Sequence, residues 1–89
     1  MKDTITIDKL KTGEKAYITN IELEDAIRRR LWDLGLIEGS LIEKIGESPM
    51  GDPGAFIIKN TVLAIRKKDG KKIFAKGIDI NESIKTDRK

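Results

Sequence analysis

One stretch of this chain contains the signals for a helix and for the point at which that helix ends. Ile27, Leu31 and Leu34 recur at a spacing that places them on one helical face. Gly35 follows at the position where a helix commonly ends in a residue with positive φ. With Gly35 at C′, Leu36 takes the C″ position and can close onto Leu31 at C3, as in a Schellman motif. The sequence therefore predicts an amphipathic helix that ends sharply at Gly35.

A tight loop is the second strong constraint. Residues 47–54 hold two prolines and two glycines, which excludes a regular helix or strand in this segment. The prolines fix φ, a glycine gives freedom, and the side chain of Asp52 can accept hydrogen bonds from nearby backbone amides. We favour this interpretation as a rigid turn. The alternative is direct contact with a partner through the loop residues Pro49, Met50, Gly51, Asp52 and Pro53.

Short β-prone runs separated by turn residues make up most of the remaining chain. We expect strands at residues 15–21, 41–45, 55–59, 61–66 and 72–75, and the helix at residues 25–34. The turn between the third and fourth of these strands should use Asn60 together with Lys59, because Asn tolerates positive φ. The dipeptide Asp69-Gly70 predicts another turn in the basic connection that follows.

These elements favour one small domain with a mostly β fold. A chain of 89 residues with 38% hydrophobic content suffices for one core and not for two. About five short strands with one inserted helix favour a strongly bent barrel over a two-sheet sandwich. We therefore predict a small SH3-like β-barrel at residues 1–77, followed by a polar tail at residues 78–89 that can begin with a short edge strand. An OB-fold is the alternative, although its helix usually lies later in the chain.

The chain contains neither cysteine nor histidine. Their absence excludes disulfides, zinc fingers and catalysis by a thiolate or an imidazole. The oxygen ligands that remain suit Mg²⁺ or Ca²⁺ rather than a tight transition-metal site. The hydroxyls of Ser40, Ser48 and Ser83 have no evident partner base. We therefore expect no enzymatic activity, no cofactor and no bound metal.

Charge and hydropathy point to a soluble protein of the cytoplasm. No apolar stretch approaches the ~20 residues needed to cross a bilayer, and the first residues lack the apolar block of a signal peptide. The absence of cysteine also fits the cytoplasm. The net charge is +3 with 37% charged residues, an excess too mild to indicate nucleic-acid binding by itself.

The predicted helix offers a candidate recognition surface. If its apolar stripe faces inward, Trp32 lies on the outer side with Arg28 and Arg29 nearby. Trp and Arg are the residues most enriched at interface hot spots. The sequence therefore predicts a docking patch formed by Arg28, Arg29 and Trp32. An equal alternative is that Trp32 packs over the barrel edge or beneath the C-terminal tail.

A basic cluster is the second candidate surface. It consists of Arg66, Lys67, Lys68, Lys71 and Lys72. Such runs usually form a solvated surface, but they can also contact an acidic protein, anionic lipid headgroups or nucleic acid. Small barrels that bind nucleic acid generally stack bases on strand aromatics, and most of the three available aromatics (Tyr17, Phe56 and Phe74) are expected in the core.

The ordered set of motifs resembles a known family. The residues that carry the resemblance are Arg30, Leu31, Leu34, Gly35, Leu36 and Gly39, then Pro49, Gly51, Asp52 and Pro53, then Ala64, Ile65 and Arg66. Their order and spacing resemble the ferrous iron transport accessory protein A (FeoA) family, and Leu10-Lys11-Thr12-Gly13 is similar to its usual start. Glu38 stands where relatives commonly have Pro, and Gly70 stands where they tend to have Ala, which makes a turn likelier than a short helix after Arg66.

The resemblance implies both a fold and a partner. It implies an SH3-like barrel whose helix lies between the first two expected strands and covers one side. It also implies an accessory role in ferrous iron uptake, in which the chain binds and regulates the cytosolic portion of the membrane transporter FeoB. Two alternatives stay open: a free-standing SH3-like regulatory domain related to those of metal-dependent transcriptional repressors, and a nucleic-acid-binding small barrel.

Overall fold

The strands alternate between buried and exposed positions, as expected for a sheet with one face on a core. The computed structural model describes residues 4–78. The strands are β1 (Thr4–Thr6), β2 (Lys15–Ile21), β3 (Leu41–Glu47), β4 (Gly54–Ile58), β5 (Thr61–Ile65) and β6 (Ile73–Gly77). The helices are the 3-10 turn η1 (Ile7–Lys9), α1 (Asp25–Asp33) and α2 (Lys67–Gly70).

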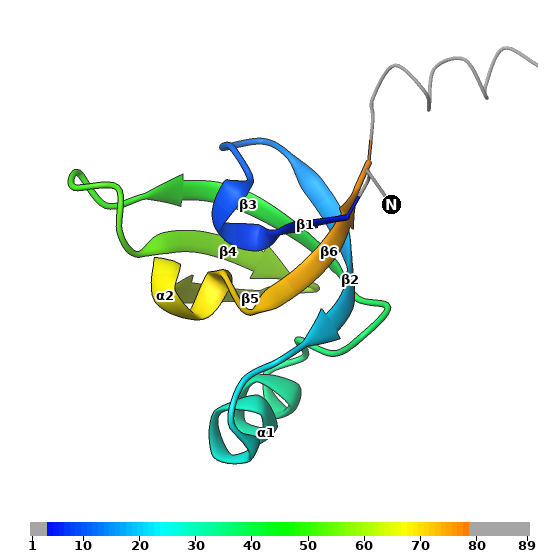
Figure 1. Ribbon diagram of the computed structural model, residues 1–89. Coiled ribbons are helices and arrows are strands. Elements are labelled where there is room, and N and C mark those ends of the chain that lie inside the picture. The colour runs from blue at the N-terminus through cyan, green and yellow to red at the C-terminus, as the bar shows by residue number, and fades with distance from the viewer. Residues whose placement is uncertain (1–3, 79–89) are drawn as a thin grey trace, which may run out of the picture.

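All six strands belong to one antiparallel sheet in the order β1-β6-β2-β3-β4-β5. Figure 1 shows that this sheet curves strongly around a single interior. The predicted mostly β architecture with one inserted helix is confirmed. In the described part of the chain, β1 and β5 each pair with one neighbour, so hydrogen bonds do not close the barrel.

The core fills the concave side of the sheet. Its fully buried side chains come from η1, from the strands and from the segment after α1: Ile7, Ile18, Ile21, Leu36, Ile42, Ile58 and Ile73. Most of the three strand aromatics were expected in the core, but only Phe56 is buried: Phe74 is half-buried and Tyr17 is 49% exposed.

The end of α1 follows the predicted Schellman pattern. The Leu36 N–H donates to the carbonyl oxygen of Leu31 at 2.9 Å, and the Gly35 N–H donates to that of Trp32 at 2.9 Å. Gly35 has φ +103°, a conformation that favours glycine. The helix therefore stops where the sequence predicts.

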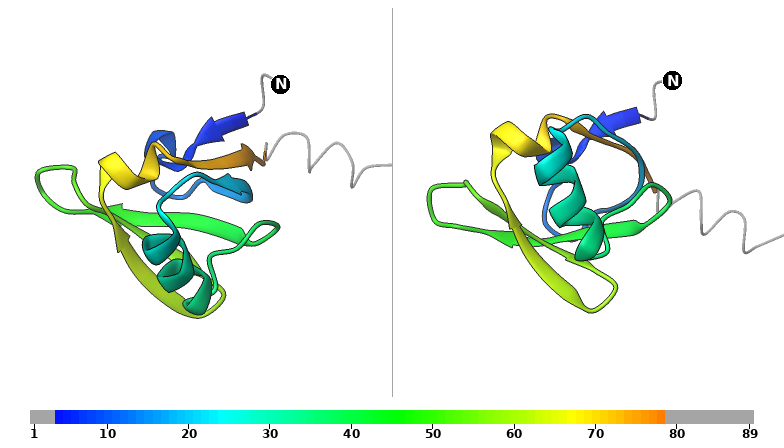
Figure 2. Two further views of the ribbon diagram at one scale, coloured as in Figure 1. Left: turned by 60° about the horizontal axis from the view of Figure 1, so that its bottom comes forward. Right: turned by 90° about the horizontal axis from the view of Figure 1, so that it is seen from below.

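The predicted inward stripe of α1 is only partly correct. Leu31 packs against the core, but Ile27 and Leu34 are 36% and 40% exposed, and α1 contains no buried residue. Figure 2 shows α1 over one end of the curved sheet rather than along a face, so only one residue of the row reaches the core. Leu36, directly after the helix, is 0% exposed and supplies the anchor instead.

The prediction of a turn at residues 67–72 is wrong, because Lys67–Gly70 form the short helix α2. Gly70 allows the helix to approach η1 closely. A Cβ at Gly70 would stand 3.3 Å from both the Cβ and the backbone nitrogen of Asp8. This tertiary contact outweighs the local turn preference of Asp69-Gly70.

Other differences are local. The sequence missed β1, which is only three residues long. In the turn between β4 and β5 the residue with positive φ is Lys59, at +58°, rather than Asn60. Strand β3 continues past an irregularity in pairing between Lys44 and Gly46 and ends two residues later than expected. The predicted tail and its edge strand lie, apart from Ile78, outside the described residues.

Candidate functional site

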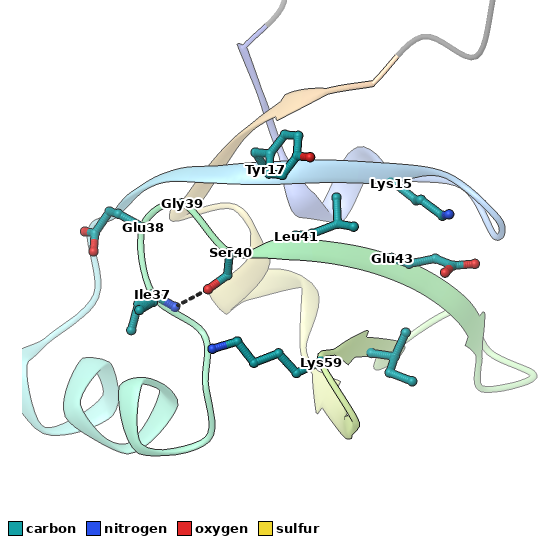
Figure 3. A pocket seen from close by; sticks show the side chains of 10 residues that line it. Lys15, Tyr17, Ile37, Glu38, Gly39, Ser40, Leu41, Glu43 and Lys59 are labelled. Atoms are coloured by element: carbon teal, nitrogen blue, oxygen red, sulfur yellow. Dashed lines mark hydrogen bonds between the residues drawn. The ribbon is translucent and has the colours of Figure 1, made fainter. Parts of the chain in front are cut away.

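A groove of about 670 Å³ crosses the outer face of the sheet at β2, β3 and β4, with the turn at residues 37–40 at one end (Figure 3). Its apolar lining comes from three segments. Tyr17 and Leu41 lie directly opposite each other on β2 and β3 and are 49% and 41% exposed. Ile57 on β4 and Ile37 in the turn extend this surface. The groove therefore offers a partner an apolar floor that solvent reaches.

Charged side chains of both signs surround this floor. Lys15 and Glu43 face each other across β2 and β3. Glu38 and Lys59 line the groove as well, and Figure 3 shows them on separate segments of its rim. Because the charges are mixed, the groove suits a partner with an apolar centre and a polar rim rather than a strongly acidic or basic ligand.

The hydroxyl of Ser40, one of the residues that line the groove, has a structural role. Ser40 is 8% exposed, and its Oγ donates to the carbonyl oxygen of Gly35 at 3.0 Å. The Ser40 Oγ also accepts a hydrogen bond from the Ile37 N–H at 3.4 Å (Figure 3). The Ser40 hydroxyl is therefore engaged with the backbone of the segment between α1 and β3. Within residues 4–78, no three residues among His, Cys, Asp and Glu group closely enough to hold a metal ion.

The α1 patch, Arg28, Arg29 and Trp32, lies on the exposed side of the helix. Trp32 is 43% exposed, and the guanidinium carbon of Arg28 stands 5.5 Å from its ring centroid, within cation–π range. Arg28 also donates to the Asp25 carboxylate at 2.8 Å. Asp25 and Trp32 therefore hold Arg28 from two sides, while Arg29 is exposed beside them.

The β3–β4 loop, residues 48–53, is built differently from the prediction. Ser48 closes the loop, because its Oγ donates to the Asp52 carbonyl oxygen at 2.8 Å and accepts from the Asp52 N–H at 3.2 Å. The Asp52 side chain does not bond to a nearby amide in the sequence. Its Oδ1 accepts from the backbone N–H of Lys67, the first residue of α2, at 3.0 Å. The Gly-Asp-Pro motif thus ties this loop to α2.

A buried lysine supports the base of the same loop. Lys44 is 7% exposed, and its ammonium donates to the Glu47 carboxylate at 2.6 Å. That hydrogen bond and the charge of Lys44, with a smaller effect of Lys67, lower the pKa of Glu47 against the opposing effect of burial. The carboxylate is therefore held in its charged form.

This pair predicts a pH-dependent difference in stability between the wild type and Glu47→Gln. A carboxyl whose folded-state pKa is lowered contributes stability above its unfolded-state pKa, which is about 4.3 for glutamate, and loses it as the pH falls through the lowered value. We expect the variant to be less stable in urea unfolding at pH 7, and the difference to vanish in acid. A difference that persists unchanged in acid would contradict this role of Glu47.

The structure does not bring the α1 patch and the β3–β4 loop into one surface. Figures 1 and 2 show the loop extending beyond α2, away from α1. The groove lies closer to α1: a Cβ added to Gly35, at the helix end, would stand 4.0 Å from the Cδ of Lys59, which lines the groove. Sequence reasoning missed Tyr17, Leu41 and Ile57 as surface residues, although period-two alternation with buried Ala16, Ile18, Ile42 and Ile58 could have identified them.

Comparison with known proteins identifies one family. The FeoA domain profile matches residues 5–77. An Fe(2+) transport protein A/Fe(2+) transporter FeoB fusion protein of Porphyromonas gingivalis is 28% identical over 75 residues, which cover 84% of this chain and 9% of that protein. The chain thus spans less than a tenth of that relative.

Among residues 4–78, no helix has the length and apolar character needed to cross a membrane.

Solved structures agree with the fold. The FeoA protein of Chlorobium tepidum superposes with a TM-score of 0.81 at 31% identity, over 84% of this chain and 71% of that one. Stenotrophomonas maltophilia FeoA complexed with zinc, described as an SH3 domain protein, gives a TM-score of 0.66 at 25% identity, over 80% and 88% of the two chains. The SH3-like prediction is confirmed. A manganese-dependent transcriptional repressor gives 0.74 at 9% identity, over 84% of this chain and 42% of that one, a likeness of fold alone.

Proposed function

This chain belongs to the FeoA family of ferrous iron transport proteins, and from that premise we propose that it is a cytoplasmic accessory protein that binds and regulates the transporter FeoB. It acts by recognition and not as an enzyme. The absence of cysteine and histidine supports this part of the proposal, since the best ligands for Fe²⁺ chemistry are missing from the chain.

The FeoA–FeoB fusion in Porphyromonas gingivalis is the observation that carries the proposal. Fusion holds two modules at a high effective concentration, which favours contacts that are otherwise intermolecular. That relative combines Fe(2+) transport protein A and the Fe(2+) transporter FeoB in one chain. Its similarity to this protein covers 75 residues, the length of one small domain. We infer that the separate domain forms the same contact with a separate FeoB.

The α1 patch and the adjoining groove are the proposed docking surface. Trp32 and Arg28 form a preorganised pair, because a cation–π contact and an ion pair to Asp25 restrict the arginine before a partner arrives. The chain runs from the helix end directly into the turn at residues 37–40, which lines the groove. One partner can therefore cover both the ring of Trp32 and the apolar floor of the groove.

A binding titration against FeoB solubilised in a neutral detergent tests this proposal. We expect saturable binding by the full chain, and at least a tenfold weaker affinity for Trp32→Ala, because truncating an aromatic hot-spot residue costs about 2 kcal/mol or more. Met50→Ser is the matched control: Met50 is 90% exposed on the β3–β4 loop, so its replacement should leave the affinity unchanged.

Two results would contradict the proposal in different ways. Absence of saturable binding by the unmodified chain would reject FeoB as the partner. A loss with Met50→Ser and none with Trp32→Ala would move the docking surface from α1 to the β3–β4 loop.

A further inference from the structure

The α2 basic cluster, Arg66, Lys67, Lys68, Lys71 and Lys72, takes no part in the docking surface proposed above. All five residues lie in α2 or next to it, and all five are exposed to solvent. None of them forms an ion pair with a carboxylate in residues 4–78. The cluster therefore presents a dense positive charge on a protein whose net charge is only +3.

The carboxylates beside this cluster form no ion pair with it in residues 4–78, although Lys67 lies close enough to lower the pKa of Glu47. Asp52 accepts a hydrogen bond from the backbone of Lys67 rather than from a cationic head. Glu47 is bonded to the ammonium of Lys44. Asp69, half-buried within α2, is the one acidic residue of that helix. The cationic heads are thus available to an anionic partner.

An apolar tip stands next to the same cluster. Met50 is 90% exposed at the end of the β3–β4 loop. A hydrogen bond from the Lys67 N–H to the Asp52 side chain, at 3.0 Å, ties this loop to α2. The Lys67 ammonium also lies beside the loop, because a Cβ added to Gly51 would stand 4.0 Å from it. Figure 2 shows the loop and α2 on the same part of the molecule. Met50 is therefore presented beside lysine heads on a loop that its own hydrogen bonds shape.

We propose that the α2 basic cluster and Met50 together contact the anionic headgroups of a lipid bilayer. The cations meet the headgroups and the methionine side chain enters the interfacial layer. This inference rests on the proposed function, since a domain docked to a membrane transporter lies beside a bilayer whose cytoplasmic leaflet is negatively charged.

The composition of the surface favours lipid over other polyanions. Four of the five cations are lysines, whose long stems reach a headgroup layer while an apolar residue is inserted. Nucleic-acid surfaces of small barrels add aromatic rings for stacking, and the surface formed by the cluster and the loop contains none. An acidic protein surface could also pair with the cations. It would not offer the apolar layer in which the side chain of Met50, 90% exposed, could be buried.

Cosedimentation of the full chain with vesicles tests the inference without the transporter. The vesicles contain phosphatidylcholine alone or an equal mixture of phosphatidylcholine and phosphatidylglycerol. We expect binding to the mixed vesicles only, weakened by salt. Each cation near an anionic leaflet strengthens binding by roughly fivefold, so Lys68→Glu with Lys71→Glu should weaken it at least tenfold. Met50→Ser should weaken it by roughly threefold, because less apolar area is buried.

The matched control is Lys15→Glu with Lys76→Glu. This pair makes the same change in net charge at the start of β2 and near the end of β6 that lies farther along the chain from α2, and it should retain most of the vesicle binding. Failure of the unmodified chain to bind mixed vesicles at low salt would overturn the inference. Equal losses for the control and the α2 pair would overturn it as well. Unchanged binding by Met50→Ser would overturn the part assigned to Met50 and leave a contact made by the cations alone.

The same variants separate this inference from the proposed function. In neutral detergent, Lys68→Glu with Lys71→Glu should bind FeoB as the unmodified chain does. Vesicle binding without FeoB binding would reject the partner and leave the lipid contact standing. FeoB binding without vesicle binding would reject the lipid contact and leave FeoB as the partner.

Discussion

Ile42→Ala is expected to lower the free energy of unfolding by about 2–5 kcal/mol. Ile42 is 0% exposed on β3 and lies opposite Ile58, which is also 0% exposed, on β4. Truncation removes buried methyl and methylene groups and leaves a cavity that a sheet of fixed register cannot close. Small domains have a total stability on the order of 5–15 kcal/mol, so this loss is a large part of it.

Thermal unfolding followed by circular dichroism measures the effect. In a domain of this size each kcal/mol shifts Tm by about 4–8 °C, so we expect a fall on the order of 10–20 °C or more. The control is Val62→Ala on β5, which removes an apolar side chain that is 60% exposed and should change stability by less than about 0.5 kcal/mol. Equal Tm values for the two variants would show that Ile42 does not support the core.

Features with local signals could be predicted from the sequence. The end of α1 depends on a glycine with positive φ and on hydrogen bonds between residues three to five apart, all visible in the run that ends at Leu36. Strand β2 was predicted with its observed bounds, Lys15–Ile21, because β-branched and aromatic residues are frequent in it. The pair of Arg28 and Trp32 was likewise predictable, since residues four apart share a helical face.

Features that depend on distant partners could not be predicted. The hydrogen-bond partner of the Asp52 side chain is 15 residues away, at the first residue of α2, whereas local rules suggested a neighbouring amide. The helix α2 itself depends on the fit of Gly70 against η1, which lies near the other end of the chain. The groove needs three strands in register before it exists, so no single segment of sequence encodes it.

Strand β2 was predicted correctly, but the exposure of Tyr17 within it was not. Most of the strand aromatics were expected in the core, but the neighbours of Tyr17, Ala16 and Ile18, are 0% and 2% exposed. Because alternate residues of a strand point to opposite faces, burial of these two places Tyr17 outside. Register outweighs hydrophobicity here, and the exposed ring becomes part of the candidate docking groove.

Gly35→Ala is expected to lower the free energy of unfolding by about 2 kcal/mol, because a residue with a Cβ is strained at positive φ. Gly35 has φ +103°. Space is not the obstacle: a Cβ would stand 3.8 Å from the Cγ2 of Ile58, an ordinary contact. The loss therefore comes from the backbone of the Schellman motif, which positions the core anchor Leu36 and the turn that lines the groove.

Urea unfolding at neutral pH checks this prediction against Gly46→Ala. Gly46 lies in β3 and lacks a positive φ, and a Cβ added there would meet no atom within 4 Å, so its replacement should change stability by less than about 0.5 kcal/mol. Gly35→Asn should lose less than Gly35→Ala, since Asn tolerates positive φ better than other residues with a Cβ. If Gly35→Ala proved as stable as Gly46→Ala, the left-handed end of α1 would not be what fixes the helix, and Leu36 and the groove turn would have to be held by their packing alone.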